Sequence, residues 1–98
     1  MAKYTNLDFF HDRKRFADET KERAEDYERK GNYVDAKRCY FEAAKKYKDA
    51  AEYARNFGHG VYEVHYSFFD QEEDMMIEYE YCMMQVKAMI QLQIGRTL

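Results

Sequence analysis

The stretch that decides the fold of this chain is RAEDYERKGNYVDAKRCYFEAAKKY, residues 23–47. Large aromatic and small residues recur in it at intervals of three and four, and a single glycine, Gly31, divides it. Apolar residues at that spacing lie on one face of a helix. Glycine readily adopts the left-handed conformation that often ends a helix. The stretch therefore predicts two helices joined by a tight turn.

Upstream of the turn, the apolar pattern predicts a helix over residues 6–30. Thr5 or Asn6 can cap its first amides, and the charge of Asp8 suits the positive end of the helix dipole. The positions that we expect to be apolar contacts are Leu7, Phe9, Phe10, Phe16, Ala17, Thr20, Ala24 and Tyr27.

Downstream of the turn, a second helix is predicted over residues 32–57. Large Tyr and small Ala alternate along most of its apolar stripe, so another helix can approach at the Ala positions while Tyr rings fill the gaps. The stripe consists of Tyr33, Ala36, Tyr40, Ala43, Tyr47, Ala50, Ala54 and Phe57. Residues 58–60, Gly-His-Gly, predict a loop.

The remainder, residues 61–95, is predicted to be helical, with a possible break near residue 70. Within it, VYEVHYSFF (61–69) alternates apolar and polar residues like a strand. A single strand would have no partner in this chain, so a helix is the favoured interpretation. An acidic run over 70–74 could begin a fresh helix.

Fourteen of the twenty residues from 75 to 94 are apolar, and five of these are methionine. This predicts a long apolar C-terminal helix. A helix that is apolar on every side must be covered on every side. We therefore expect an all-α, three-helix bundle with an antiparallel hairpin, whose last helix is central, forms an oligomer interface, or lines a groove for a partner.

Composition supports a single helical domain over residues 1–98. The absence of proline and the presence of only four glycines argue against an all-β chain, which needs frequent turn residues. Residues 1–60 carry fourteen Lys/Arg and twelve Asp/Glu, whereas residues 61–98 carry two and seven. A nucleic-acid partner is unexpected, because it requires a strong basic excess. The acidic back half could meet a basic partner or be a solvated face.

The two cysteines, Cys39 and Cys82, are too few for a disulfide framework. The N-terminus is polar and charged, unlike a signal peptide. We therefore expect reduced thiols and a cytoplasmic location. No membrane span is expected, because the most apolar segment still contains charged residues.

Seven residues of the central stretch match the spacing of a tetratricopeptide repeat. They are Ala24, Tyr27, Gly31, Tyr33, Ala36, Tyr40 and Ala43. The stretch therefore resembles that family, although Lys48 stands where the closing proline would be and Thr20 where the leading aromatic would be. The resemblance covers about a third of the chain. It implies that the face of the first helix contacts a protein ligand, and the matching residues are Asp18, Lys21, Glu25, Glu28 and Arg29.

The second predicted helix is longer than in such a repeat. In this respect the chain is similar to microtubule-interacting and trafficking domains, which are three-helix bundles with a similar GNY-x-x-A turn. Their third helix usually has a charged, amphipathic pattern, and residues 75–94 lack it.

Candidate chemical groups are sparse, so we predict no enzyme activity, no cofactor and no metal site. His11 and Asp12 are adjacent, but a metal-dependent hydrolase needs further His and Asp at matching positions. His59 and His65 are ligands by type, yet loop polarity or partial burial explains them as well. The acidic run over 70–80 lacks an accompanying nucleophile or phosphate-binding loop.

The methionines are the most suggestive feature, because methionine is common on surfaces that accept several partners. We predict a non-enzymatic protein-interaction module, an adaptor or a small inhibitor, that also forms homo-oligomers. Its second contact surface would comprise Met75, Met76, Tyr79, Met83 and Met84. The alternative is a self-assembling bundle that binds a small molecule or nucleotide between helices, with stacking by Tyr62, Tyr66, Tyr79 and Tyr81.

Overall fold

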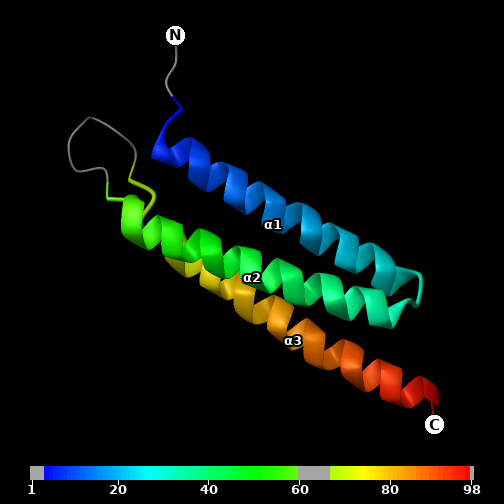
Figure 1. The fold of residues 1–98 in the computed structure, drawn as a ribbon. Coiled ribbons are helices and arrows are strands. Elements are labelled where there is room, and N and C mark those ends of the chain that lie inside the picture. Colours follow the sequence, from blue (N-terminus) through cyan, green and yellow to red (C-terminus); the bar gives the residue numbers. More distant parts are fainter. Residues whose placement is uncertain (1–3, 60–66, 98) are drawn as a thin grey trace.

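The computed structural model of the protein describes residues 4–59 and 67–97. These segments contain three helices, α1 (Asn6–Arg29), α2 (Tyr33–Phe57) and α3 (Gln71–Thr97), and no strand. In Figure 1, α2 lies between α1 and α3 and runs antiparallel to both. The main helix contacts are those that α2 makes with each neighbour. The all-α, three-helix prediction is confirmed, and the bundle is elongated and flat, with extents of 59 × 25 × 13 Å.

The α1–α2 hairpin has well-formed ends. Thr5 caps α1, accepting a hydrogen bond from the Asp8 amide while the Asp8 carboxylate accepts one from the Thr5 amide at 2.8 Å. At the other end Gly31 has φ 75°, as predicted, so it turns the chain without steric strain. The Asn32 amide then donates to the Tyr27 carbonyl at 2.9 Å, which satisfies one of the last carbonyls of α1.

The region between α2 and α3 interrupts the helix predicted over residues 61–95. Residues 67–70 lie outside any helix and α3 begins only at Gln71, so the break considered near residue 70 is present and a helix running unbroken from 61 is wrong. The question of helix or strand over 61–66 lies outside the described residues. The carbonyl of Gly58 fixes the turn by accepting hydrogen bonds from the Phe68 and Phe69 amides and the Ser67 hydroxyl, at 2.9–3.0 Å.

Gly58 is the point of closest backbone approach in this turn. A Cβ placed on it would lie 2.3 Å from the Ala54 carbonyl oxygen and 2.7 Å from the Phe69 nitrogen. Its φ of −90° is ordinary, so its requirement is for space and not for a left-handed backbone. Phe68, just beyond, is buried and its ring lies 5.2 Å from that of Phe10, which ties the turn to α1.

The predicted Tyr–Ala stripe of α2 forms the core. All of its members from Ala36 to Ala54 are buried, and Tyr40 and Tyr47 are among the largest fully buried side chains. Phe57, at the end of the expected stripe, is exposed. On α1, the expected positions Phe10, Ala17, Thr20 and Ala24 are buried.

Phe9 and Phe16 are exposed, so their assignment to the apolar face of α1 is wrong. Each of these two residues directly precedes a buried one. Because successive side chains of a helix point about 100° apart, Phe9 and Phe16 lie off the narrow stripe that faces α2. Isolated exposed apolar side chains of this kind are common on protein surfaces.

α3 contacts α2 through a stripe that repeats every seven residues. Met75, Cys82 and Met89 are its fully buried members. The opposite side carries Glu80 and Lys87, both exposed. The prediction of a helix that is apolar nearly all round is therefore wrong: polar residues recur on the side that faces away from α2. None of the described helices is long and apolar enough to span a membrane.

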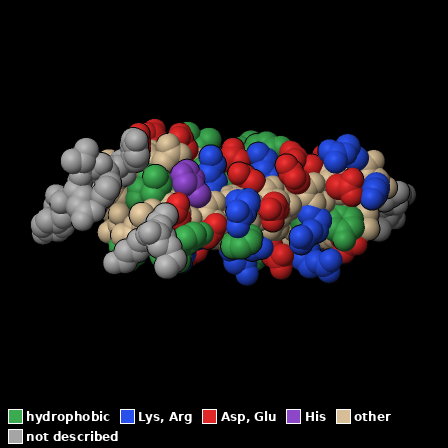
Figure 2. All heavy atoms as spheres, turned by 90° about the horizontal axis from the view of Figure 1, so that it is seen from above, with side chains coloured by type: hydrophobic (Ala, Val, Ile, Leu, Met, Phe, Trp, Pro, Cys, Tyr) green, Lys and Arg blue, Asp and Glu red, His purple; other side chains and the backbone are tan. Residues whose placement is uncertain are grey.

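The surface seen from the side of α1 carries both signs of charge. Figure 2 shows Lys/Arg and Asp/Glu side chains interspersed over this face, with separate hydrophobic groups between them. Several of these charges pair along α1, including Arg15 with Asp12 at 3.2 Å and Lys30 with Asp26 at 2.9 Å. Exposed pairs of this type are screened by solvent and contribute little to stability.

Candidate interaction groove between α1 and α3

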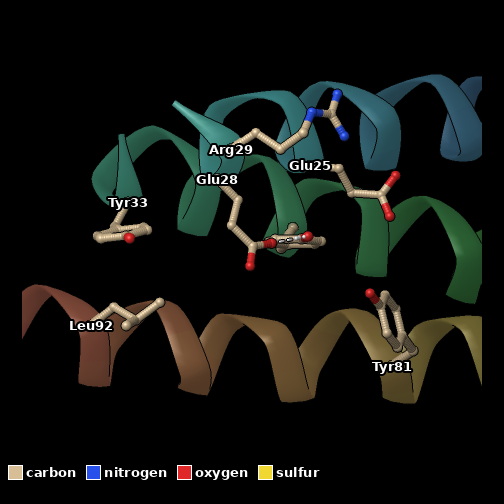
Figure 3. A pocket seen from close by; sticks show the side chains of 7 residues that line it. Glu25, Glu28, Arg29, Tyr33, Tyr81 and Leu92 are labelled. Carbon is tan, nitrogen blue, oxygen red and sulfur yellow. Dashed lines mark hydrogen bonds between the residues drawn. The ribbon is translucent and has the colours of Figure 1, made fainter. Parts of the chain in front are cut away.

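An open groove of about 330 Å³ runs between α1 and α3, with α2 as its floor. Its lining comes from all three helices and consists of Glu25, Glu28, Arg29, Tyr33, Tyr40, Tyr81 and Leu92. Figure 3 shows that the Glu28 side chain extends from α1 into the groove, while Tyr81 and Leu92 lie on α3 across from it. We call this feature the α1–α3 groove. Its chemistry is mixed: two carboxylates, one guanidinium, three phenols and one aliphatic side chain.

The floor of the groove is fixed by a buried tyrosine. The Tyr40 hydroxyl donates a hydrogen bond of 2.6 Å to Glu28 Oε1, although Tyr40 is only 1% exposed. Burial, together with this carboxylate, raises the pKa of Tyr40 far above its usual range. Tyr40 therefore stays protonated and holds Glu28 in a defined position. Arg29, on the rim, pairs with Asp26 at 3.5 Å.

Glu25 is the least engaged carboxylate of the groove. It is half-buried on α1, and within the described parts of the chain it forms no ion pair and no hydrogen bond. Across the groove, Tyr81 has a pKa raised by burial and by the charge of Glu25. Glu25 thus places a negative charge beside the Tyr81 ring, and the same charge helps to raise the pKa of Lys21.

One end of the groove is closed by a pair that joins α1 to α3. Lys21 Nζ lies 2.8 Å from Glu78 Oε2, and the same ammonium lies 4.9 Å from the centre of the Tyr81 ring. Burial alone would lower the pKa of Lys21, but the hydrogen bond and charge of Glu78 outweigh it and raise that pKa. A second cavity, of about 310 Å³, lies beyond this pair and includes Asp18, Asp74 and Met75 in its lining.

The five α1 residues predicted to contact a ligand lie along the α3-facing side of α1. Glu25, Glu28 and Arg29 line the groove, Asp18 lines the second cavity, and Lys21 separates the two. Asp18, Lys21 and Glu28 are already bonded within the chain, since Asp18 accepts a hydrogen bond from the buried Tyr47 hydroxyl.

The five α3 residues predicted as a second contact surface do not share one surface. Met75 is buried against α2 and belongs to the core. Met76, Tyr79 and Met83 are partly buried beside the core, whereas Met84 is 67% exposed. Met75 therefore belongs to the core and not to an exposed contact surface, because successive residues of a helix point about 100° apart.

Sequence reasoning placed Tyr33 and Tyr40 in the packing stripe and did not assign them to a groove. The spacing signal is the same for both roles, because a stripe residue at the edge of a helix interface also borders the adjoining groove. Leu92 was not predicted as a groove residue. It follows Tyr81 by eleven residues, which is three turns of helix, so both lie on the same side of α3. This spacing was the signal that could have identified Leu92. Among the tyrosines of the small-molecule alternative, Tyr62 and Tyr66 lie outside the described residues and Tyr79 sits beneath Lys48.

The other candidate groups have structural surroundings. His59 stacks on Phe69 at 4.5 Å and contacts the Arg55 carbonyl. Both cysteines are buried, and burial raises the pKa of Cys39 and raises that of Cys82 to about 12. A thiol with a raised pKa is a poor nucleophile at neutral pH. In the described segments, no group of three or more His, Cys, Asp or Glu side chains could hold a metal ion.

Comparison with known proteins adds no relative: no protein-family model, no curated protein and no solved structure matches this chain.

Proposed function

We propose that the protein is a non-enzymatic interaction module, an adaptor or small inhibitor, whose α1–α3 groove binds an arginine- or lysine-bearing segment of a partner protein. The observation that carries this proposal is the position of Glu25, a half-buried carboxylate without an ion pair in the described chain, facing an aromatic wall. Partly desolvated carboxylates attract cations more strongly than fully hydrated ones.

The chemistry of the lining favours a guanidinium over other groups. A guanidinium can form two parallel hydrogen bonds to one carboxylate and stack its flat face on an aromatic ring. Glu25 offers the carboxylate, and Tyr33 and Tyr81 offer rings in the same lining. A volume of about 330 Å³ is at the small end for ligand sites and suits one long side chain better than a cofactor.

The adaptor role and the cytoplasmic location have their own support. The resemblance to a tetratricopeptide repeat implies a ligand-contacting face on the first helix, and that face borders the groove. The buried thiols are compatible with a reducing, cytoplasmic location.

A peptide selection tests the proposal directly. The wild-type protein is used to select from a displayed library of random peptides, and the same selection is run with Glu25→Lys. We expect wild-type selection to enrich Arg and Lys, and Glu25→Lys to abolish that enrichment. Glu19→Lys is the matched control, because it makes the same charge change at an exposed position of α1 outside the groove.

A second measurement locates the binding. Titration with the peptide acetyl-Ala-Ala-Arg-Ala-Ala-amide, followed by NMR, should shift the signals of Tyr33, Tyr81 and Leu92 more than those of exposed α2 residues. The glutamine counterpart of the peptide should produce much smaller shifts. Enrichment that is unchanged by Glu25→Lys, or shifts that are equal for both peptides, would refute the groove as an arginine site.

A further inference from the structure

The side of α3 that faces away from α2 has a sequence pattern that is symmetric about its own midpoint. Two apolar pairs, and a third pair of one apolar and one polar residue, alternate along it with single charges, each kind returning after seven residues. In order, the residues are Met76 and Ile77, Glu80, Met83 and Met84, Lys87, and Ile90 with Gln91. We call this set the outer face of α3.

Exposure shows that the outer face is uncovered. Ile77, Met84 and Ile90 are 56%, 67% and 40% exposed, and Met76 and Met83 are half-buried at its edge. At about 100° per residue, these side chains lie on the side of α3 roughly opposite to Met75, Cys82 and Met89, which pack on α2. Glu80 and Lys87 lie between the two rows of this face, and exposed apolar groups gathered on one face are typical of interaction sites.

The charges decide the occupant. Glu80 and Lys87 are exposed and form no ion pair within the described chain. The midpoint of the pattern lies between Met83 and Met84. Reversing the helix about that midpoint exchanges Glu80 with Lys87, Met83 with Met84 and Ile77 with Ile90, and it sets Met76 opposite Gln91. The outer face is therefore complementary to a reversed copy of itself.

From this complementarity we propose that two copies of the chain associate through the outer faces of α3, antiparallel, about a two-fold axis near Met83 and Met84. In that arrangement Met83 and Met84 meet their counterparts, Ile77 meets Ile90, and each Glu80 faces Lys87 of the other copy. A two-fold interface of this kind uses the same patch on both copies, so every contact occurs twice. A seven-residue repeat keeps such a seam continuous along both helices.

The proposed interface leaves the α1–α3 groove open. At about 100° per residue, Tyr81 and Leu92, which line the groove, lie about 120° around α3 from Glu80 and Lys87 at the middle of the outer face, whereas Ile77 at its edge lines the second cavity. Groove binding and self-association are therefore independent properties, and Glu25→Lys should leave the dimer unchanged.

Charge reversal tests the proposal and its orientation. Glu80→Lys would set two ammonium groups against each other at both charged positions of the dimer, and Lys87→Glu would set two carboxylates against each other there. We expect each single variant to raise the dimer dissociation constant about tenfold, as two reversed exposed pairs would. The double variant should restore the wild-type value. An equimolar mixture of the two single variants should form mixed dimers with wild-type affinity.

Sedimentation equilibrium measures the dissociation constants, with one variant carrying a mass tag in the mixing experiment. Glu52→Lys, an exposed site on α2 with the same charge change, should dimerise like the wild type. Met84→Glu should favour the monomer while retaining its helix content by circular dichroism, because Met84 is exposed and makes little contribution to the core. A wild-type protein that stays monomeric at millimolar concentration overturns the proposal. So do charge-reversed variants that dimerise unchanged, which would indicate a parallel pair or another face.

Discussion

The interfaces that α2 forms with its two neighbours are built differently. Between α1 and α2, buried tyrosines donate hydrogen bonds to carboxylates, namely Tyr40 to Glu28 and Tyr47 to Asp18. From α3, the buried residues that join the core are Met75, Cys82 and Met89, all of them sulfur-containing. The main polar contact at the α2–α3 interface is an ion pair of Arg55 with Glu72 at 3.8 Å, at its exposed edge.

This difference shows how the register of one helix against its neighbour is fixed. A hydrogen bond is directional and fails when one helix slides by a fraction of a turn. Contacts among apolar groups are non-directional, and methionine adapts to several packings. The α1–α2 interface is therefore expected to have one register, whereas α3 depends on the turn at Gly58 for its placement.

Gly58→Ala should disturb the turn that places α3, and we expect it to have the largest effect on the free energy of unfolding. The added Cβ would overlap the Ala54 carbonyl and the Phe69 backbone, neither of which is a flexible side-chain end. We expect the free energy of unfolding to fall by about 3 kcal/mol, the upper range for forced overpacking. Urea unfolding followed by circular dichroism measures it.

Gly95→Ala is the matched control, because nothing lies within 4 Å of a Cβ at Gly95. Alanine favours helix over glycine, so this variant should be unchanged or more stable by up to about 1 kcal/mol. Equal stability of the two alanine variants would contradict the role given to Gly58.

Tyr47→Phe tests the directional interface. It removes the hydroxyl that donates to Asp18 and leaves a half-buried carboxylate without that donor. A hydrogen bond to a charged group contributes about 2 kcal/mol, so we expect a loss of this size. Tyr53→Phe removes an exposed bond of 3.0 Å to Asn6 and should cost well under half as much. Similar losses in both variants would contradict the importance of burial.

The same tyrosines predict the response to alkaline pH. Burial raises the pKa of Tyr40 and Tyr47 above the ordinary value of 10.0, so the folded state retains protons that the unfolded state releases. Their contribution to stability is complete below pH 10 and is lost as pH rises beyond it. The slope should be about −1.4 kcal/mol per pH unit for each tyrosine. Urea unfolding of Tyr47→Phe should show a shallower slope, and an unchanged slope would contradict the assignment.

The two cysteines allow the interfaces to be compared in one protein. Cys39 lies on α2 near Arg23 of α1, and Cys82 lies on α3, and both are almost fully buried. If α3 opens more readily, Cys82 should react with a thiol reagent about tenfold faster than Cys39, a difference of about 1.4 kcal/mol in opening free energy. Labelling rates of Cys39→Ala and Cys82→Ala measure this. Faster reaction of Cys39 would reverse the proposed order of opening.

Breaking the Lys21–Glu78 ion pair between α1 and α3 should have the smallest effect on the free energy of unfolding. Lys21 and Glu78 form a 2.8 Å pair whose side chains are 24% and 32% exposed. A double-mutant cycle with Lys21→Met and Glu78→Gln should give a coupling of at most about 1 kcal/mol, reduced further by salt. A coupling energy well above this value would mean that the Lys21–Glu78 pair joins α1 to α3 more tightly than a solvent-exposed ion pair does.

The sequence predicted the α1–α2 hairpin well because its signals are local. The Thr5 cap, the turn at Gly31 and the Tyr–Ala stripe each depend on residues close together in the chain. The prediction failed for α3, where apolar composition concealed a buried stripe of only one residue in seven. The start of α3 at Gln71 agrees with the acidic run over 70–74, whereas the hydrogen bonds from Gly58 that define the turn before it had no signal in the sequence.

The α1 wall of the α1–α3 groove could be predicted from the sequence, and the α3 wall could not. A family resemblance pointed to Glu25, Glu28 and Arg29, all of which line it. Its opposite wall, Tyr81 and Leu92, depends on how far α3 stands from α1, and no local pattern encodes that distance. Composition also could not separate Met75, which is buried, from Met84, which is exposed, because both are methionine on one helix.

The central position of α2 has a consequence for folding kinetics. Each main interface joins helices that are neighbours in the sequence, since α1 and α3 make few direct contacts. Chains dominated by such local contacts fold fast, typically within microseconds to milliseconds. The α1–α2 hairpin, with its directional bonds, can form first and then serve as the surface on which α3 condenses. We therefore expect hydrogen exchange to be slowest in α2 and to divide the chain between an early hairpin and a late third helix.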